Sequence, residues 1–195
     1  AQALALALPQ LEAAGIALVA IGIGDAAGAD RFCTYTGLPR ACLQVEPDAS
    51  LHRSLGLYPG LELPGGPWPG LLLMCAGIGS PGTLAEVLRG YTGDRQAPQR
   101  LPLPLFRLAG GEGFLRPFEL ATVRLQNMVE VLSRWRTYVP RDEFITQRGG
   151  TYLLAADNTL LYRHRDPGIL GFSATMARPL AFLEPFLEPA ASAQD

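Results

Sequence analysis

The sequence predicts an α/β fold in a single domain, residues 1–195. Helix-like segments alternate with apolar, strand-like segments over the first 57 residues, which is typical of a sheet covered by helices. Two further apolar runs near the C-terminus are joined by an Asp-Asn turn, which indicates an antiparallel hairpin. With 195 residues, 48% of them hydrophobic, the chain is long enough to bury one sizeable core but short for two.

The first helix–strand unit is predicted over residues 1–24. Residues 1–14 are rich in Ala, Leu, Gln and Glu and stop at Gly15, as expected for a helix that is kinked or restarts at Pro9. Residues 16–24, IALVAIGIG, form a continuous apolar run closed by glycine. This run predicts a strand buried on both faces.

The next segments repeat this pattern. Residues 27–37 can form a helix that ends at Gly37, residues 42–47 a short strand, and residues 48–57 a helix capped by Asp48. A loop rich in proline and glycine is then expected over residues 59–70.

The sequence predicts mainly helices in the middle of the chain. The run LLLMCA, residues 71–76, fits either a strand or a buried helix, and residues 83–91 form a helix with a capping-box pattern from Thr83 to Glu86. A second helix is predicted at about 117–136, after a proline-rich connector. Its apolar residues recur at helical spacing, which favours core packing. They are Leu120, Val123, Met128, Val131, Leu132 and Trp135.

The C-terminal part returns to sheet. Residues 151–156 and 159–165 form the two arms of the hairpin, with the turn at Asp157 and Asn158, and a helix is expected near 174–187.

Gly77, Gly79 and Gly82 have the G-x-G-x-x-G spacing of a dinucleotide-binding turn. Such a site also needs an acidic residue at the end of a second strand about 20 residues later, to hold the ribose hydroxyls. The corresponding stretch, QRLPLPLFRL, has no acidic residue. A turn that starts a helix, with Ser80 as N-cap and Pro81 after it, is therefore favoured over a nucleotide site.

Composition excludes several other classes of function. The chain has no lysine, so a Walker phosphate loop is ruled out, and no apolar run approaches the length of a membrane span, although peripheral association is left open. Residues 89–148 hold ten arginines against six acidic residues, but these are scattered without an aromatic platform, which argues against nucleic acid. The cysteines form no C-x-x-C and lie far from His52 and His164, so no metal and no cofactor are expected.

Longer strings of the sequence resemble a known family. LPQLEAAGI, RFCTYTGLP, VEPDASLHRSLGL and RGGTYLLAADNTLLYRHRD are similar to peroxiredoxin-like proteins of the AhpC/TSA group, within the thioredoxin superfamily. CAGIGSPGTLAEVLRGYTGDR and RDPGILGFSATM resemble a cyanobacterial and plastid branch of it.

The resemblance implies a thioredoxin-like fold, with a mixed sheet flanked by helices. Residues 1–58 would form the N-terminal half, residues 59–148 a helical and loop insertion, residues 149–188 the C-terminal ββα half, and residues 189–195 a tail. The sequence starts inside the first helix of that fold, so its first, central strand is missing. We expect upstream residues or another chain to supply a strand there, because the strand at 16–24 otherwise leaves backbone groups unpaired.

The resemblance also implies where a redox centre lies. The loop before the hairpin, Arg148, Gly149 and Gly150, would lie beside it, with Arg165 as a second flanking cation. In this family the peroxidatic cysteine follows the first strand, a position that the sequence does not include. Three cysteines remain as weak redox candidates and are most simply buried small hydrophobes: Cys33, Cys42 and Cys75. Cys33 and Cys42 could alternatively form a regulatory disulfide.

Two functions therefore stay open, and the sequence does not decide whether the chain is an enzyme. The first is thiol-dependent antioxidant or redox activity, regenerated by an external thiol reductant. The second is a non-catalytic thioredoxin-fold subunit that holds a protein partner through the 59–148 insertion. The resemblance alone places the protein in a chloroplast or in the cyanobacterial cytoplasm.

Overall fold

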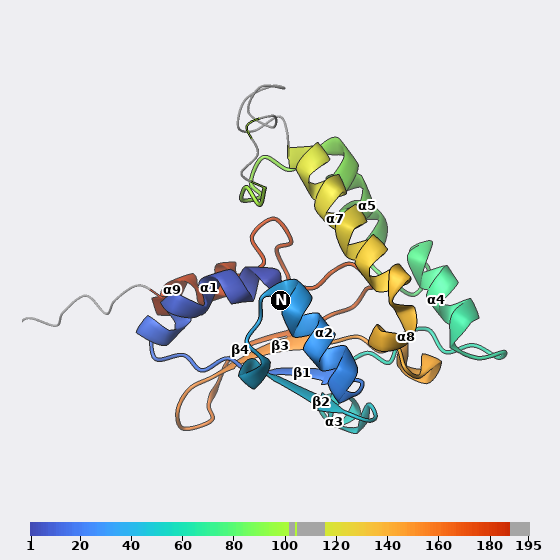
Figure 1. Ribbon diagram of the computed structural model, residues 1–195, viewed down its shortest axis with the longest axis horizontal. Helices are drawn as coiled ribbons and strands as arrows, with labels where there is room; N and C mark the ends of the chain where they lie inside the picture. The colour runs from blue at the N-terminus through green and yellow to red at the C-terminus, as the bar shows by residue number, and fades with distance from the viewer. Residues whose placement is uncertain (102–103, 105–115, 188–195) are drawn as a thin grey trace, which may run out of the picture.

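The computed structural model describes residues 1–101, 104 and 116–187 (Figure 1). The predicted tail, 189–195, and part of the proline-rich connector fall outside these residues. The N-terminal half follows the expected order of elements: α1 (Gln2–Ala13), β1 (Ala20–Ile23), α2 (Ala26–Thr36), the 3₁₀ turn η1 (Arg40–Cys42), β2 (Leu43–Glu46) and α3 (Ser50–Ser54).

The ends of α2 are set by two residues that the sequence makes conspicuous. At its start, the backbone N–H of Gly28 donates to the Asp25 carboxylate over 2.8 Å, which satisfies one of the free amides of the first turn. At its end, Gly37 adopts a left-handed conformation with φ of 75°. The predicted helix is confirmed at this position.

Strand β1 is less buried than its apolar sequence predicts. It pairs with β2 in parallel, Ala20 opposite Leu43 and Ile23 opposite Glu46. Ile21 is 39% exposed, so the expectation of a strand buried on both faces is wrong. The reason lies in the sheet: among the described strands, β1 has a hydrogen-bonded neighbour along one edge only.

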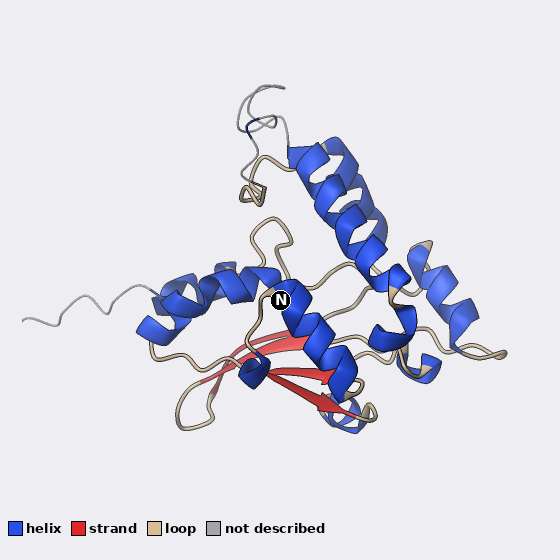
Figure 2. Ribbon diagram, viewed as in Figure 1, coloured by secondary structure: helices blue, strands red, loops and turns tan. Residues whose placement is uncertain are grey.

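The middle of the chain is helical, and LLLMCA belongs to a helix rather than a strand. The elements are α4 (Pro67–Cys75), α5 (Thr83–Thr92), α7 (Arg116–Ser133), α8 (Trp135–Tyr138) and the 3₁₀ turn η2 (Asp142–Phe144). Helices α5 and α7 lie side by side and form a hairpin that projects from the rest of the molecule (Figures 1 and 2). None of the described helices is both long and apolar enough to cross a membrane.

The glycine-rich stretch before α5 is a turn that starts a helix, as predicted. Gly77, Gly79 and Gly82 have φ angles of 89°, 63° and 81°, a region that favours glycine. Ser80 is not the N-cap, however. Its buried hydroxyl accepts from the N–H of Ile169 over 2.6 Å and also bonds the Thr83 hydroxyl. Ser80 thereby connects this turn to the segment that follows the C-terminal β-hairpin.

The capping box predicted from Thr83 to Glu86 does not form either. The Glu86 carboxylate pairs instead with Arg89 of its own helix and with Arg124 of α7, so it does not close back on the start of α5.

The C-terminal half contains the predicted antiparallel hairpin. Its elements are β3 (Gly150–Leu154), β4 (Leu160–Arg165), the 3₁₀ turn η3 (Ala181–Leu183) and the short helix α9 (Glu184–Leu187). Asn158 at the turn has a φ of 66°, a conformation that asparagine tolerates. The helix expected over 174–187 is wrong except for its last turn, because Pro179 disfavours helical backbone at the residue before it.

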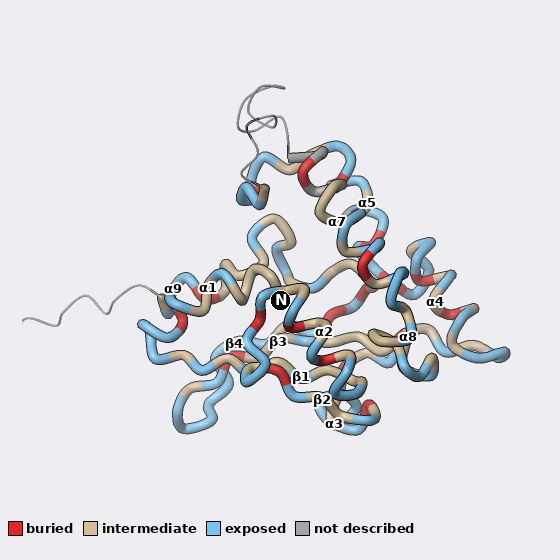
Figure 3. Tube along the Cα trace, viewed as in Figure 1, coloured by how far each residue is buried: buried red, intermediate tan, exposed pale blue. Residues whose placement is uncertain are grey.

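Two apolar clusters hold the body together, by which we mean everything outside the α5–α7 hairpin (Figure 3). The first joins α2 to β2 through Ala29, Cys33, Leu38 and Leu43. The second joins α1, β3 and η3 through Leu11, Leu153 and Leu183. The class is α/β with parallel and antiparallel pairs, as expected, but the described strands form two separate two-stranded sheets, β1–β2 and β3–β4.

Candidate functional site

The loop that leads into β3 is held firmly against the segment that follows α3. The backbone N–H of Arg148 donates to the carbonyl oxygen of Tyr58 over 2.8 Å, and the Gln147 amide donates to the same oxygen over 3.0 Å. The Thr146 hydroxyl donates to the Pro59 carbonyl oxygen over 2.9 Å. Three consecutive residues are thereby fixed in place, so the loop can position a side chain accurately.

Arg148 is the cation that this loop positions. Its Nε donates to the Thr146 carbonyl oxygen over 2.8 Å and its Nη2 to that of Ile145 over 3.0 Å, so the guanidinium is folded back onto its own loop. Burial lowers the pKa of Arg148, while the negative charges of Asp166 and of a Cys75 thiolate act in the opposite direction. The sequence identified Arg148, and the structure places Asp166 and Cys75 within electrostatic reach of it.

Asp166 and His164 bring two more titratable groups to the same place. Asp166 is 7% exposed, and burial raises its pKa, whereas His164 and Arg148 lower it. His164 Nε2 and Asp166 Oδ1 lie 3.2 Å apart but without the alignment of a hydrogen bond, and both atoms are buried with no other partner among the described residues. Two buried polar atoms without hydrogen bonds are costly in a fold, and they occur here beside the half-buried cation of Arg148.

Gly149 and Gly150 allow the chain to pass close to these groups. The backbone N–H of Asp166 donates to the Gly149 carbonyl oxygen over 3.0 Å. A Cβ at Gly150 would lie 2.7 Å from both the His164 carbonyl oxygen and a Leu57 methyl group, which no side chain could accommodate. The Gly-Gly pair therefore permits the contact between the loop and the end of β4.

Arg165, the other predicted cation, lies elsewhere. It is exposed, and its guanidinium packs over Gly56, the glycine after α3, which has a φ of 65°. Arg148 and Arg165 thus belong to different environments, one inside the loop and the other on the surface.

The three cysteines differ in their surroundings, and all three are free thiols. Cys33 is buried in the first apolar cluster, and burial raises its pKa. Cys42 is half-buried at the edge of that cluster. Cys75, at the end of α4, is exposed, so the expectation that it is a buried hydrophobe is wrong. Helix α4 presents it on its outer side because Met74, its neighbour, takes the buried position.

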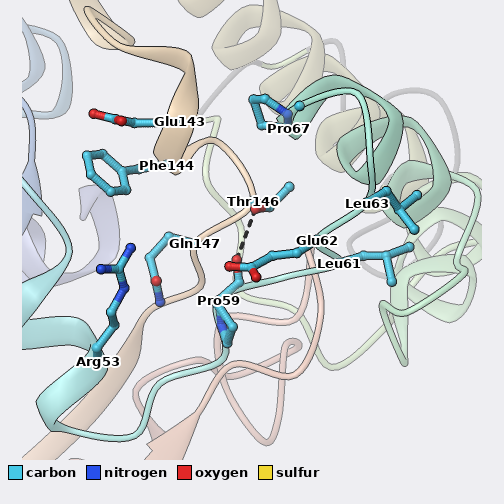
Figure 4. Close-up of a pocket in the computed structure, with 11 residues that line it drawn as sticks. Arg53, Pro59, Leu61, Glu62, Leu63, Pro67, Glu143, Phe144, Thr146 and Gln147 are labelled. Carbon is cyan, nitrogen blue, oxygen red and sulfur yellow. Dashed lines mark hydrogen bonds between the residues drawn. The ribbon is translucent and has the colours of Figure 1, made fainter.

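Two cavities lie next to this loop. A cavity of about 200 Å³ is lined by Arg53, Glu62, Phe144 and Gln147, among others (Figure 4). A larger one of about 460 Å³ lies at the carboxyl ends of β1 and β2 and is also lined by Phe144. The carbons of the Arg53 and Arg141 guanidinium groups lie 6.0 and 5.0 Å from the centre of the Phe144 ring. We call Arg148, Asp166, His164 and Cys75 the Arg148 cluster. Neither cavity is lined by a cysteine, so each is a neighbour of this cluster rather than part of it.

The described residues contain no cluster of histidine, cysteine, aspartate and glutamate suited to a metal ion. The chemistry that the Arg148 cluster can support is that of a fixed positive charge near a thiol, with a carboxyl and an imidazole close by. The sequence analysis missed Asp166 and His164. No spacing in the sequence marks them. Asp166 lies just past the end of β4, and only the pairing of β3 with β4 brings it and His164 opposite the start of β3.

Comparison with known proteins identifies a family that matches this chain. A profile of the family described as AhpC/TSA antioxidant enzyme matches residues 3–168, which is most of the chain. No curated protein and no solved structure matches significantly. The matched range runs from the second residue of α1 past the end of β4 and includes the whole Arg148 cluster, and the chain accordingly belongs to the peroxiredoxin-like AhpC/TSA family of thioredoxin-like proteins.

Proposed function

We propose that this protein is a thiol-dependent peroxide reductase whose reaction centre is the Arg148 cluster. The observation that carries the proposal is the half-buried guanidinium of Arg148, fixed by two carbonyl oxygens and within electrostatic reach of Cys75 and Asp166. A thiolate is the reactive form of cysteine, and a neighbouring cation stabilises it. A cation that cannot move away is better suited to this task than one on a flexible surface side chain.

The chemistry follows from these groups. The thiolate attacks one oxygen of a hydroperoxide, the O–O bond breaks, and the sulfur becomes a sulfenic acid while an alcohol or water leaves with a proton. An external thiol then reduces the sulfenic acid, which yields water and a mixed disulfide, and a second thiol releases the protein. The charge of Arg148 offsets the negative charge on the leaving oxygen, and Asp166, whose pKa is raised by burial, can exchange the proton.

Two thiols can serve in this reaction. Cys75 is the exposed cysteine, and its negative charge as a thiolate acts to raise the pKa of Arg148. Cys33 is buried, and burial raises its own pKa, which lowers its fraction of thiolate. The second candidate is a thiol at the peroxidatic position that the family resemblance implies, a position that none of Cys33, Cys42 and Cys75 matches.

Hydrogen peroxide consumption in the presence of dithiothreitol tests the proposal. We expect turnover by the wild-type protein, a loss of at least about 100-fold in Arg148→Met, and normal rates in Cys33→Ser and in the surface variant Arg165→Met. Loss of turnover in Cys75→Ser would identify that thiol, and full activity in it would direct the search to the remaining cysteines and to the peroxidatic position that the resemblance implies. Absence of turnover in the wild type, or full activity in Arg148→Met, would refute the proposal.

A second candidate function is a non-catalytic binding subunit. It is favoured by one observation, the apolar residues exposed on the α5–α7 hairpin within the 59–148 insertion. Protein that binds through this hairpin but does not turn over peroxide would support it. A location in the chloroplast or in the cyanobacterial cytoplasm fits either function and is proposed from the resemblance alone.

A further inference from the structure

The α5–α7 hairpin carries its charged side chains on the inside. Arg89 pairs with Glu86 at 3.0 Å and with Asp94 at 2.8 Å, and Arg124 of α7 reaches Glu86 at 3.2 Å. Arg124 also donates to the Glu86 carbonyl oxygen over 2.6 Å. Gly90 makes room for this arrangement, since a Cβ there would lie 2.2 Å from the Arg124 guanidinium. Arg124 therefore joins the two helices through Glu86, within an ion-pair network on the inner side of the hairpin.

The outside of the same hairpin is apolar. Seven large hydrophobic residues are each between 53% and 73% exposed, and we call them the outer face. They are Leu84, Leu88 and Tyr91 on α5, and Leu125, Met128, Val129 and Leu132 on α7. The sequence analysis assigned Met128 and Leu132 to the core, and both assignments are wrong.

Helical spacing puts these residues in one stripe on each helix. Positions three, four and seven apart share a side, as they do in both sets. On α7, the opposite side faces the body: Asn127 bonds Gln2 and Tyr35, and Glu130 bonds Arg31. The stripe on α7 therefore points away from the body, and that on α5 points away from the ion pairs with α7.

The outer face carries no charge. The other exposed residues of α5 and α7, as far as their side chains are described, are also neutral: Ala85, Thr92, Gln126 and Ser133. This pattern is the reverse of an ordinary surface helix, which turns its apolar stripe inward and its charges to water. A large exposed apolar patch on a protein marks an interaction surface.

We propose that two copies of this chain pair through the outer face of the α5–α7 hairpin. A two-fold contact brings a surface against itself, so a charged surface would repel its own copy, whereas a neutral apolar one is complementary to itself. Together the two stripes expose on the order of 800 Å² per copy, which is the upper limit of what the pairing can bury and is comparable to the area that a standard stable interface buries on each partner. An anionic lipid surface is less suited, since such surfaces attract helices with a basic polar face, which the exposed side of this hairpin lacks.

The molar mass in solution tests this pairing. Size-exclusion chromatography with light scattering, over a series of protein concentrations, should give twice 20.9 kDa at the upper end. In Leu88→Glu/Leu132→Glu, the dissociation constant should rise at least about 100-fold, because two charges per copy would be buried without partners. The matched control is Leu6→Glu, which places the same charge on the exposed side of α1, where Leu6 is 83% exposed, and should leave the mass unchanged.

Circular dichroism shows whether the double variant is folded. If it is not, the milder Leu84→Gln/Val129→Gln carries the test, with the same expected loss of dimer. A wild-type protein that stays at 20.9 kDa throughout, or folded variants that dimerise as the wild type does, would overturn the proposal. A monomer that sediments with phosphatidylcholine vesicles would also overturn it, and would assign the outer face to lipid instead.

Discussion

Leu11 and Leu88 are both helical leucines, but Leu11 is 1% exposed in the body and Leu88 is 60% exposed on the hairpin. Around Leu11 the body follows the usual arrangement, with apolar side chains of α1, β3 and η3 in contact. Around Leu88 the arrangement is reversed, and the inward side of α5 carries Glu86 and Arg89. The body is therefore stabilised mainly by apolar burial, and the hairpin by charge pairing and by whatever covers its outer face.

The largest expected effect is in the body. Leu11→Ala removes a side chain that the α1, β3 and η3 residues enclose, so it should lower the free energy of unfolding by about 2–5 kcal/mol. Urea denaturation followed by circular dichroism measures this loss.

The matched control is Leu88→Ala, which in the monomer should change the free energy of unfolding by less than about 0.5 kcal/mol. Equal losses in the two variants would contradict the comparison between body and hairpin.

An intermediate effect is expected inside the hairpin. Arg124→Met keeps the length of the side chain but removes its hydrogen bonds to Glu86, and should cost about 1–3 kcal/mol. Hydrogen exchange measured by mass spectrometry should show the loss of protection in α5, while β3 and β4 stay protected. If α5 exchanges as in the wild type, the ion pairs do not hold the hairpin together.

The joint between hairpin and body should respond to acid. Glu130 of α7 accepts from Arg31, and also from Tyr138 and Arg134, and these contacts lower its pKa to about 2. This pKa lies below the value of about 4.3 in an unfolded chain, so the stabilisation is complete above that pH and disappears as the pH falls through about 2.

The test is Glu130→Gln, which should be less stable than the wild type at pH 7 and equal to it near pH 2. Unfolding by urea at several pH values measures the difference. A difference that does not change with pH would show that the charge of Glu130 plays no part.

Much of the body could be predicted from the sequence, because local signals there agree with the tertiary structure. Gly37 ends α2 where a left-handed residue is needed, and Asn158 turns the β3–β4 hairpin. The errors arise where distant contacts override local patterns. Thr83 and Glu86 spell a capping box, but Arg124, 38 residues from Glu86 in the chain, takes the carboxylate. Met128 and Leu132 have the spacing of a buried stripe, yet it is the polar side of α7 that packs inward.

The candidate site was predictable in part. Arg148, Gly149 and Gly150 could be predicted from the resemblance, since the loop before the β3–β4 hairpin has a fixed position in the fold. Asp166 comes near Arg148 because its N–H bonds Gly149, a tertiary pairing that no spacing of residues in the sequence displays. Cys75 is exposed because Met74, its neighbour in α4, takes the buried position, and this orientation is not marked in the sequence.

The base of the hairpin contains both tryptophans of the chain. Trp68 on α4 and Trp135 at the start of α8 have ring centres 5.5 Å apart, and the Trp68 indole donates to Asp142. Intrinsic tryptophan emission therefore reports on this one junction, while the strands and α1 contribute none. A change in tryptophan fluorescence would therefore report movement or detachment of the α5–α7 hairpin at its base. If the unfolding transition followed by fluorescence occurs at a different denaturant concentration from the transition followed by circular dichroism, the hairpin and the body unfold independently.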